Sequence, residues 1–186
     1  MKTLSDDELF EVVQKAIADT LRISLSKVTH DSLLFHELGA ESLDFVDIEF
    51  RLESELGVEF YHGSAVEKLA ELLAPEAVEV NGLLTSFGAA VLRARMPEVD
   101  PLRLEKGKGA QGIESMFTTR TWIRVAKEIL SARPQLCPKC RSDQFKLLRP
   151  SVLLCLECRS EMNCPTGEDI LIDWSRHAPA QMHELS

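Results

Sequence analysis

No stretch of this sequence is apolar over the roughly 18 to 20 residues that a membrane-spanning helix needs. The first ten residues, MKTLSDDELF, are acidic where a secretory leader would be basic and then apolar. These two absences predict a cytoplasmic protein. Internal repeats and long low-complexity tracts are absent as well. With 45% hydrophobic and 27% charged residues, the chain is expected to fold around a buried core.

Basic charge is scarce in the first part of the chain. Residues 1–75 contain 16 Asp and Glu but only 6 Lys and Arg, a balance of −10, whereas residues 76–186 contain 14 and 15, a balance of +1. An acidic segment repels nucleic acid and anionic membranes, and it favours basic protein partners drawn in by electrostatic steering. We therefore expect protein partners, and neither nucleic acid nor a membrane.

Hydrophobic spacing predicts a small helical unit in residues 1–75. Its first helix covers about residues 6–21 and follows Ser5, which is placed to cap it. A long connection follows, and its apolar residues are expected to fold back onto the core: Leu33, Leu34, Phe35 and Leu38. A later helix over about residues 64–73 ends before Pro75.

The middle helix of this unit covers about residues 42–56, and Gly57 is suited to end it. Its inward face is predicted to hold Leu43, Val46 and Phe50, with Ile48 as a further candidate. For Leu43 and Val46 the sequence leaves two alternatives open, because an apolar side chain here can face the core or a partner. The core is the preferred alternative for Val46.

The middle segment, residues 76–134, is predicted to be a helical extension. One amphipathic helix ends before Pro97 and carries a stripe of apolar residues: Leu83, Phe87, Ala90, Val91 and Ala94. Another is capped by Thr118 or Thr119, ends before Pro134, and carries a stripe of its own: Trp122, Val125, Ala126 and Ile129.

Four of the five cysteines form two C-x-x-C pairs, Cys137 with Cys140 and Cys155 with Cys158. Two strands, at about residues 144–148 and 152–154, are expected to join the pairs as a hairpin. Four thiolates brought together in this way would hold Zn²⁺, with no position left open for a catalytic water. A redox dithiol or a disulfide is the alternative, and Cys164 is surplus.

The cysteine spacing resembles that of the zinc ribbon family over about residues 135–160, although Arg141 and Arg159 stand where a glycine often follows each pair. We therefore expect a structural metal centre in residues 135–164 and a tail over residues 165–186. Because residues 1–75 have an apolar set of their own, this unit is expected to keep its function when zinc is lost, provided that the extension does not support its core.

The segment Leu38-Gly39-Ala40-Glu41-Ser42-Leu43-Asp44 places a glycine turn before a serine at the start of an acidic helix. Free backbone N–H groups and the positive end of the helix dipole there favour an attached phosphodiester. Most serines at helix starts are simple caps, however, so the position alone decides little. The acidic residues around Ser42 are either a solvated face or a docking surface: Glu37, Glu41, Asp44 and Asp47.

Over about residues 4–75 the sequence resembles the acyl carrier protein family, through a set of residues at matching spacing: Leu38, Gly39, Ser42, Leu43, Asp44, Val46, Glu53, Leu56 and Phe60. The resemblance implies a helical bundle with a 4'-phosphopantetheine arm on Ser42, added by a phosphopantetheinyl transferase. The arm would carry an acyl-type cargo as a thioester for separate loading and processing enzymes. Glu41 departs from the family, which usually has Asp there.

The predicted protein is mainly α, with an acyl-carrier-like helical bundle (1–75), an extra helical segment (76–134), a small zinc-ribbon β-hairpin (135–164) and a tail (165–186). We expect a carrier rather than an enzyme, serving an acyl, polyketide-like or aminoacyl pathway. One alternative is a scaffold with an unmodified carrier fold, acting through its ribbon on protein or nucleic acid. The other is a thiol redox enzyme using the C-x-x-C pairs.

Overall fold

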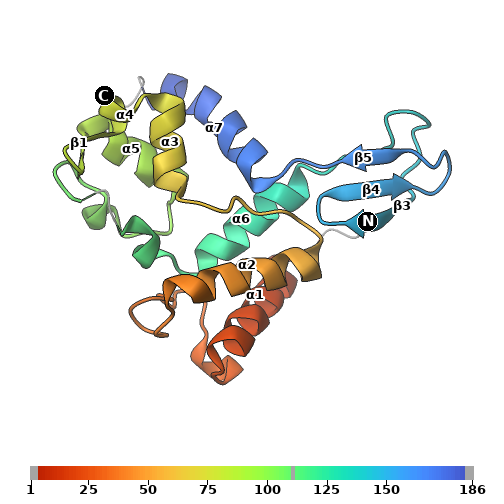
Figure 1. Cartoon of the computed structure of the whole chain (residues 1–186), viewed down its shortest axis with the longest axis horizontal. Helices are drawn as coiled ribbons and strands as arrows, with labels where there is room; N and C mark the ends of the chain where they lie inside the picture. Colours follow the sequence, from red (N-terminus) through yellow and green to blue (C-terminus); the bar gives the residue numbers. More distant parts are fainter. Residues whose placement is uncertain (1–3, 110–111, 183–186) are drawn as a thin grey trace.

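The computed structural model describes residues 4–109 and 112–182 (Figure 1). The predicted segments that include residues 1–3, 110–111 and 183–186 therefore extend in part outside the described residues. The helices are α1 (Asp6–Leu21), α2 (Ser42–Leu56), α3 (Ala65–Leu73), α4 (Pro75–Val78), α5 (Ser86–Arg95), α6 (Thr119–Ser131) and α7 (Gly167–Met182). The strands are β1 (Glu79–Val80), β2 (Leu83–Leu84), β3 (Phe145–Arg149), β4 (Val152–Cys155) and β5 (Glu161–Asn163). The chain is mainly α, as predicted.

Helix α1 begins and ends where the sequence predicts. The Ser5 hydroxyl accepts a hydrogen bond from the Glu8 N–H, and the Glu8 carboxylate accepts one from the Ser5 N–H, which closes a capping box. Leu9, Val13 and Ile17 are fully buried. They fall one above another on the helix surface, so α1 presents one apolar stripe to the core.

Helix α2 buries a different face from the one predicted. Its buried residues are Ile48, Leu52 and Leu56, whereas Leu43, Val46 and Phe50 are 82%, 58% and 67% exposed. Both sets follow helical spacing, and the sequence alone gives no sign of which one meets α1. The prediction that Leu43, Val46 and Phe50 face inward is therefore wrong, and the further candidate, Ile48, is the core residue.

Helix α6 completes the core formed by α1 and α2, although the sequence places it in the middle segment. Its Trp122, Ala126 and Ile129 belong to the same buried cluster as the apolar residues of α1 and α2. The Trp122 ring lies 6.1 Å from the Phe45 ring and 5.7 Å from the Phe60 ring, between centroids. We call this cluster the carrier core. The helical extension therefore does support this core, contrary to the condition under which residues 1–75 were expected to function without zinc.

The loop before α2 is also tied to the start of α6. The Leu34 N–H donates to the Phe117 carbonyl (3.3 Å), the Thr119 N–H to the Ser32 carbonyl (3.2 Å) and the Arg120 N–H to the His30 carbonyl (3.0 Å). Leu34 is fully buried, as predicted for this connection, whereas Phe35 is 40% exposed. The extension thus shapes the segment that leads to Ser42.

Helices α3, α5 and α7 surround a second core. Its buried members include Leu69 of α3, Leu92 of α5 and Leu171 of α7, and Trp174 packs against them. Helix α5 begins later than predicted, because Leu83 lies in the short strand β2 and Thr85 caps the helix. The segment predicted as a tail forms α7 over most of its length and supplies part of this core.

In Figure 1, helix α6 lies between the pair α1 and α2 and the group formed by α3, α5 and α7. Another face of α6 is joined to α5 of the second core by an ion pair. Both Glu128 carboxylate oxygens accept hydrogen bonds from Arg95, at 2.9 and 2.8 Å. Burial alone would raise the pKa of Glu128, but the hydrogen bonds and charges of Arg95 and Arg124 lower it. Glu128 is therefore held as a carboxylate.

The segment of residues 135–164, which we call the ribbon, forms an antiparallel sheet of three strands in the order β3-β4-β5. The predicted hairpin corresponds to β3 and β4, and the short β5 was not foreseen. The ribbon is joined to the end of α2, because the Ser151 N–H donates to the Gly57 carbonyl at 2.9 Å. Gly57 has φ of 65°, and a Cβ there would collide with the Leu147 side chain, so glycine fits this junction.

Among the described residues, none of the helices combines the length and the apolar character that crossing a membrane requires.

Candidate functional site

Ser42 is exposed and is the first residue of α2. The turn before it contains Gly39 with φ of 74°, a left-handed conformation that glycine adopts readily. The Ala40 N–H then donates to the Leu34 carbonyl at 2.9 Å, and Ala40 is buried. One side of this turn is therefore anchored in the core, and the next two residues are presented to solvent.

The Ser42 side chain does not act as the helix cap. Glu41 takes the capping position, its N–H donating to the Asp44 carboxylate at 2.7 Å, and the Ser42 hydroxyl makes no hydrogen bond to any described residue. The first N–H groups of a helix have no partner within the helix, and the dipole places positive potential there. An exposed hydroxyl at this point can carry a phosphodiester that the helix start stabilises.

Three of the four acidic residues around Ser42 already have partners within the chain. Asp44 bonds the Glu41 N–H, and Glu37 accepts from the Leu33 N–H at 3.1 Å. Asp47 accepts from Arg51 and from the Thr20 hydroxyl, each at 2.8 Å, and the Arg51 hydrogen bond lowers its pKa. These carboxylates hold the local structure as well as placing negative charge on the surface.

An exposed apolar stripe runs along α2 from the residue next to Ser42. It consists of Leu43, Val46 and Phe50. Large exposed side chains aligned on one helix face mark a contact surface more often than isolated ones do. The prediction that Leu43 is available to a partner fits this exposure, and Val46 and Phe50 extend the stripe. Their helical spacing in the sequence was visible, but it was assigned to the core.

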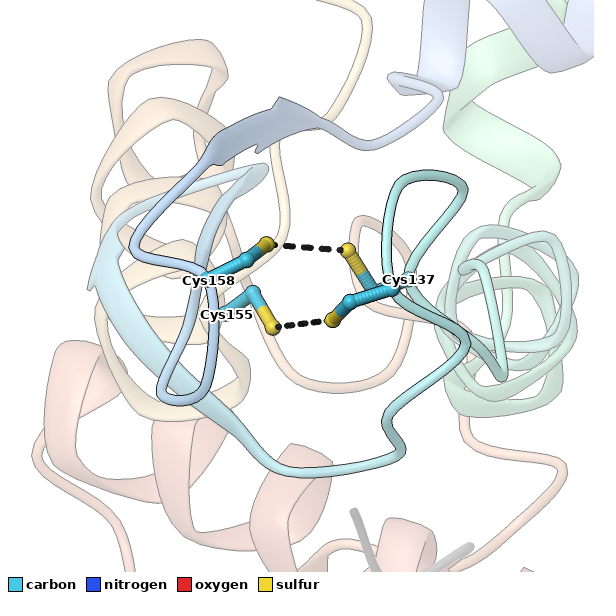
Figure 2. Close-up of side chains that lie close together, drawn as sticks. Cys137, Cys155 and Cys158 are labelled. Atoms are coloured by element: carbon cyan, nitrogen blue, oxygen red, sulfur yellow. Dashed lines mark hydrogen bonds between the residues drawn. The ribbon is translucent and has the colours of Figure 1, made fainter.

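Cys137, Cys140, Cys155 and Cys158 come together at one end of the ribbon, with their four Sγ atoms within 4.8 Å of one another. Figure 2 shows Cys137, Cys155 and Cys158 pointing into one small space. The Sγ atoms of Cys137 and Cys158 are 3.6 Å apart, and those of Cys140 and Cys155 are 3.5 Å apart. Four sulfurs about 2.3 Å from a tetrahedral zinc are about 3.8 Å from each other, so the donor set fits the metal.

The two C-x-x-C turns have the same backbone hydrogen bonds. The Arg141 N–H donates to the Cys137 carbonyl at 2.9 Å, and the Arg159 N–H donates to the Cys155 carbonyl at 3.0 Å. Arg141 and Arg159 have φ of 65° and 60°, the left-handed conformation that explains why glycine is common at these positions. Because the two turns have the same hydrogen bonding, both pairs of thiols point toward one site.

The surroundings of the thiols favour thiolate at two of the four positions. The main-chain N–H of Cys140 lowers the pKa of Cys137 to about 6, and the Ser160 hydroxyl lowers the pKa of Cys158. Cys164 does not belong to the group. It is buried in the ribbon's small core, where burial raises the pKa of its thiol.

Comparison with known proteins identifies the first part of the chain. The phosphopantetheine attachment site family matches residues 11–62. The acyl carrier protein of Petrotoga mobilis is 44% identical over 55 residues, which are 30% of this chain and 65% of that protein. That of Thermotoga maritima is 43% identical over 29% of this chain and 67% of its own length. That of Guillardia theta is 33% identical over 37% of this chain and 84% of its own.

No solved structure has significant similarity to this chain. The alignments with the Petrotoga and Thermotoga proteins span about two-thirds of those relatives and under a third of this chain. The Guillardia alignment spans most of its relative at 33% identity. On this similarity, the chain belongs to the acyl carrier protein family.

Proposed function

We propose that this protein carries acyl-type intermediates as thioesters on a 4'-phosphopantetheine arm attached to Ser42. The observation that supports this most directly is the position of Ser42: an exposed, unbonded hydroxyl at the first residue of α2, within the segment that matches the phosphopantetheine attachment site family. The protein would hold the cargo while separate enzymes perform the chemistry. The pathway would be one of acyl, polyketide-like or aminoacyl transfer.

Transfer of the arm tests the proposal. The full chain is incubated with coenzyme A and a phosphopantetheinyl transferase of broad specificity, and its intact mass is measured. We expect the mass to rise by one phosphopantetheine group, and Ser42→Ala to stay unmodified with unchanged helicity. Ser24→Ala is the matched control, because Ser24 is also an exposed serine preceding a helical turn. An unchanged wild-type mass with several active transferases would contradict the proposal and favour the scaffold alternative.

The docking surface for the transferase and the cargo-handling enzymes is proposed to surround Ser42. Glu41 is exposed, so its charge is available to a basic partner. Leu43 adds apolar contact area beside it. Glu37, Asp44 and Asp47 contribute charge, but reversing them would also break the internal hydrogen bonds described above.

We further propose that Cys137, Cys140, Cys155 and Cys158 bind one Zn²⁺ with a structural role. The sulfur spacing and the repeated turns support this assignment. Four protein ligands complete a tetrahedral site, so such a metal offers no position for a reacting water. Its contribution is to hold together a ribbon whose own apolar core is small.

A further inference from the structure

A cavity of about 480 Å³ lies where α1 and the ends of α2 and α6 meet the ribbon. Its apolar walls come from all four elements or the residues beside them: Leu4, Leu9, Leu56, Leu130, Phe145 and Leu153. Pockets for small ligands commonly have volumes of about 300 to 1,000 Å³, apolar walls and a few polar groups, and they often lie between structural units. This cavity has the size and the position of a ligand site.

Arg133 lines this cavity and carries a buried charge that is only partly compensated. The residue is 7% exposed, and its Nη2 donates to the carbonyls of Leu56 and Gly57 at 2.8 and 2.6 Å. Its Nε is buried without a partner, and Nη1 donates to no described residue. Burial lowers its pKa and the charge of Cys164 opposes this, while no carboxylate among residues 4–109 and 112–182 forms an ion pair with it.

The carbonyls at the end of α2 supply negative partial charge, which explains part of the placement of Arg133. These two hydrogen bonds use both N–H groups of Nη2, and Nε is fully buried, so Nη1 is the part of the guanidinium that a ligand can reach. A buried cation without an anion is costly, and hydrogen bonds from a guanidinium to an anion are stronger than those to a neutral group. Nη1 of Arg133 therefore suits a carboxylate in a cavity whose walls combine apolar side chains with polar ones such as Gln135 and Glu55.

We propose that this cavity binds a small amphipathic monocarboxylate, with its acid group on Arg133 and its apolar body against the leucines and Phe145. The other charges at the cavity favour a single negative charge on the ligand. Lys127 is already paired with Asp6 at 2.5 Å, and Glu55 would repel a dianion such as a phosphate monoester. The occupant is thus a free organic acid with an apolar chain.

This site is separate from the proposed arm. Ser42 and Leu56 are the two ends of α2, about 20 Å apart at the usual rise of a helix. A group bound as a thioester has no free carboxylate at its attachment point, so binding of a free acid requires neither Ser42 nor the arm. Two of the walls, Phe145 and Leu153, belong to the ribbon, so the site requires the ribbon to be folded.

Calorimetric titration of the full chain with octanoate and with octanol tests the proposal. We expect one octanoate to bind per chain, and octanol to bind about tenfold more weakly or worse because it cannot form the charged pair. Arg133→Met should abolish the preference for octanoate. Since Arg133 also bonds the end of α2, the melting temperature of this variant is measured as well.

Leu130→Trp is a second variant that leaves Arg133 in place and fills the cavity. It should lose octanoate, while Leu148→Trp, on an exposed ribbon position outside the cavity, should retain it. Ser42→Ala should bind octanoate as the wild type does, which separates this proposal from that of the arm. Equal affinity for octanoate and octanol, unchanged binding by Leu130→Trp, or lost binding by Ser42→Ala would each overturn the site, as would the absence of saturable binding to the wild type.

Discussion

Helices α3 and α6 pack in places that their positions in the sequence do not suggest. Helix α3 begins nine residues after α2 ends, yet its Val66 and Leu69 lie in the second core with α5 and α7. Helix α6 begins more than sixty residues after α2, yet its Trp122 lies in the carrier core. Order along the chain is therefore a poor guide to which helix completes the carrier bundle.

The side chains of the two helices explain why α6, and not α3, packs against α1 and α2. Trp122 contacts both Phe45 and Phe60, whereas α3 offers only valine, leucine and alanine to a core. Burying a large aromatic side chain contributes about 1.5 to 3 kcal/mol or more, while each doubling of a loop costs only about 0.6 kcal/mol. The intervening helices also have their own core to join. A helix that is distant in sequence but carries a tryptophan can therefore pack against α1 and α2 in place of a nearer helix with aliphatic side chains.

The largest predicted effect tests whether the ribbon holds the end of α2 in place. Cys155→Ser should abolish stoichiometric zinc binding and unfold the ribbon, since metal binding in small zinc modules is worth on the order of 10 kcal/mol. Hydrogen exchange at the end of α2 should then rise, because Ser151 and Arg133 no longer hold Leu56 and Gly57. Metal analysis and amide exchange measure the two effects.

The control for this prediction is Cys164→Ser, which should keep its zinc because Cys164 lies outside the four-thiol group. Zinc lost from this control would revise the ligand set. Unchanged exchange at Leu56 in the Cys155→Ser protein would show that the ribbon is an independent appendage.

A pair of core substitutions compares α6 with α3 directly. Trp122→Ala should lower the free energy of unfolding of α1 and α2 by about 3 to 5 kcal/mol and should reduce arm addition at Ser42. Leu69→Ala, at a fully buried site of α3, should cost about 2 to 5 kcal/mol in the second core and leave arm addition nearly unchanged. Denaturation monitored in each core, with intact mass after transfer, gives both results. Equal loss of arm addition in the two variants would contradict the claim that α6 supports the region around Ser42 more than α3 does.

The smallest predicted effect concerns the segment that joins α2 to α3. The His62 ring lies 2.9 Å from the Glu49 carboxylate and 3.0 Å from the Glu53 carboxylate. Burial alone would lower the pKa of His62, but the hydrogen bond to Glu49 and the nearby carboxylates raise it. Charged His62 is therefore favoured in the folded protein, and its contribution is present below the ordinary histidine pKa of about 6.5 and lost as pH rises through the raised value.

His62→Gln should consequently cost more stability at about pH 6 than at about pH 8.5, by less than about 1 kcal/mol, because the side chain is half exposed. Burial raises the pKa of Glu49 and the hydrogen bond and charge of His62 oppose this, so charged His62 also stabilises the Glu49 carboxylate at about pH 6. Urea denaturation at the two pH values provides the measurement. A larger cost at the higher pH would contradict the assigned sign.

Local features were predicted well from the sequence because short-range chemistry determines them. Ser5 with Glu8 sets the start of α1, Thr118 precedes α6 as expected, and the spacing of the cysteine pairs correctly indicated their clustering. The buried face of α2 was wrong because that helix has two apolar stripes, and only contact with α1 and α6 shows which is internal.

Long-range packing could not be predicted from the same signals. The strand β5 has three residues, too few for a periodic pattern, and it is defined by its pairing with β4. Arg133 follows a helix and no sequence pattern marks it as buried, because its burial arises only when the ribbon covers the end of α2. The cavity beside it needs four segments to meet, so no single stretch of sequence indicates it.

The central claim is that α6, rather than α3, completes the bundle that presents Ser42. Nuclear Overhauser effects from the Trp122 indole test it most directly in solution. We predict cross-peaks from this indole to the rings of both Phe45 and Phe60, whose centroids lie 6.1 and 5.7 Å away. Their absence, together with cross-peaks from Leu69 of α3 to the same two rings, would contradict the account.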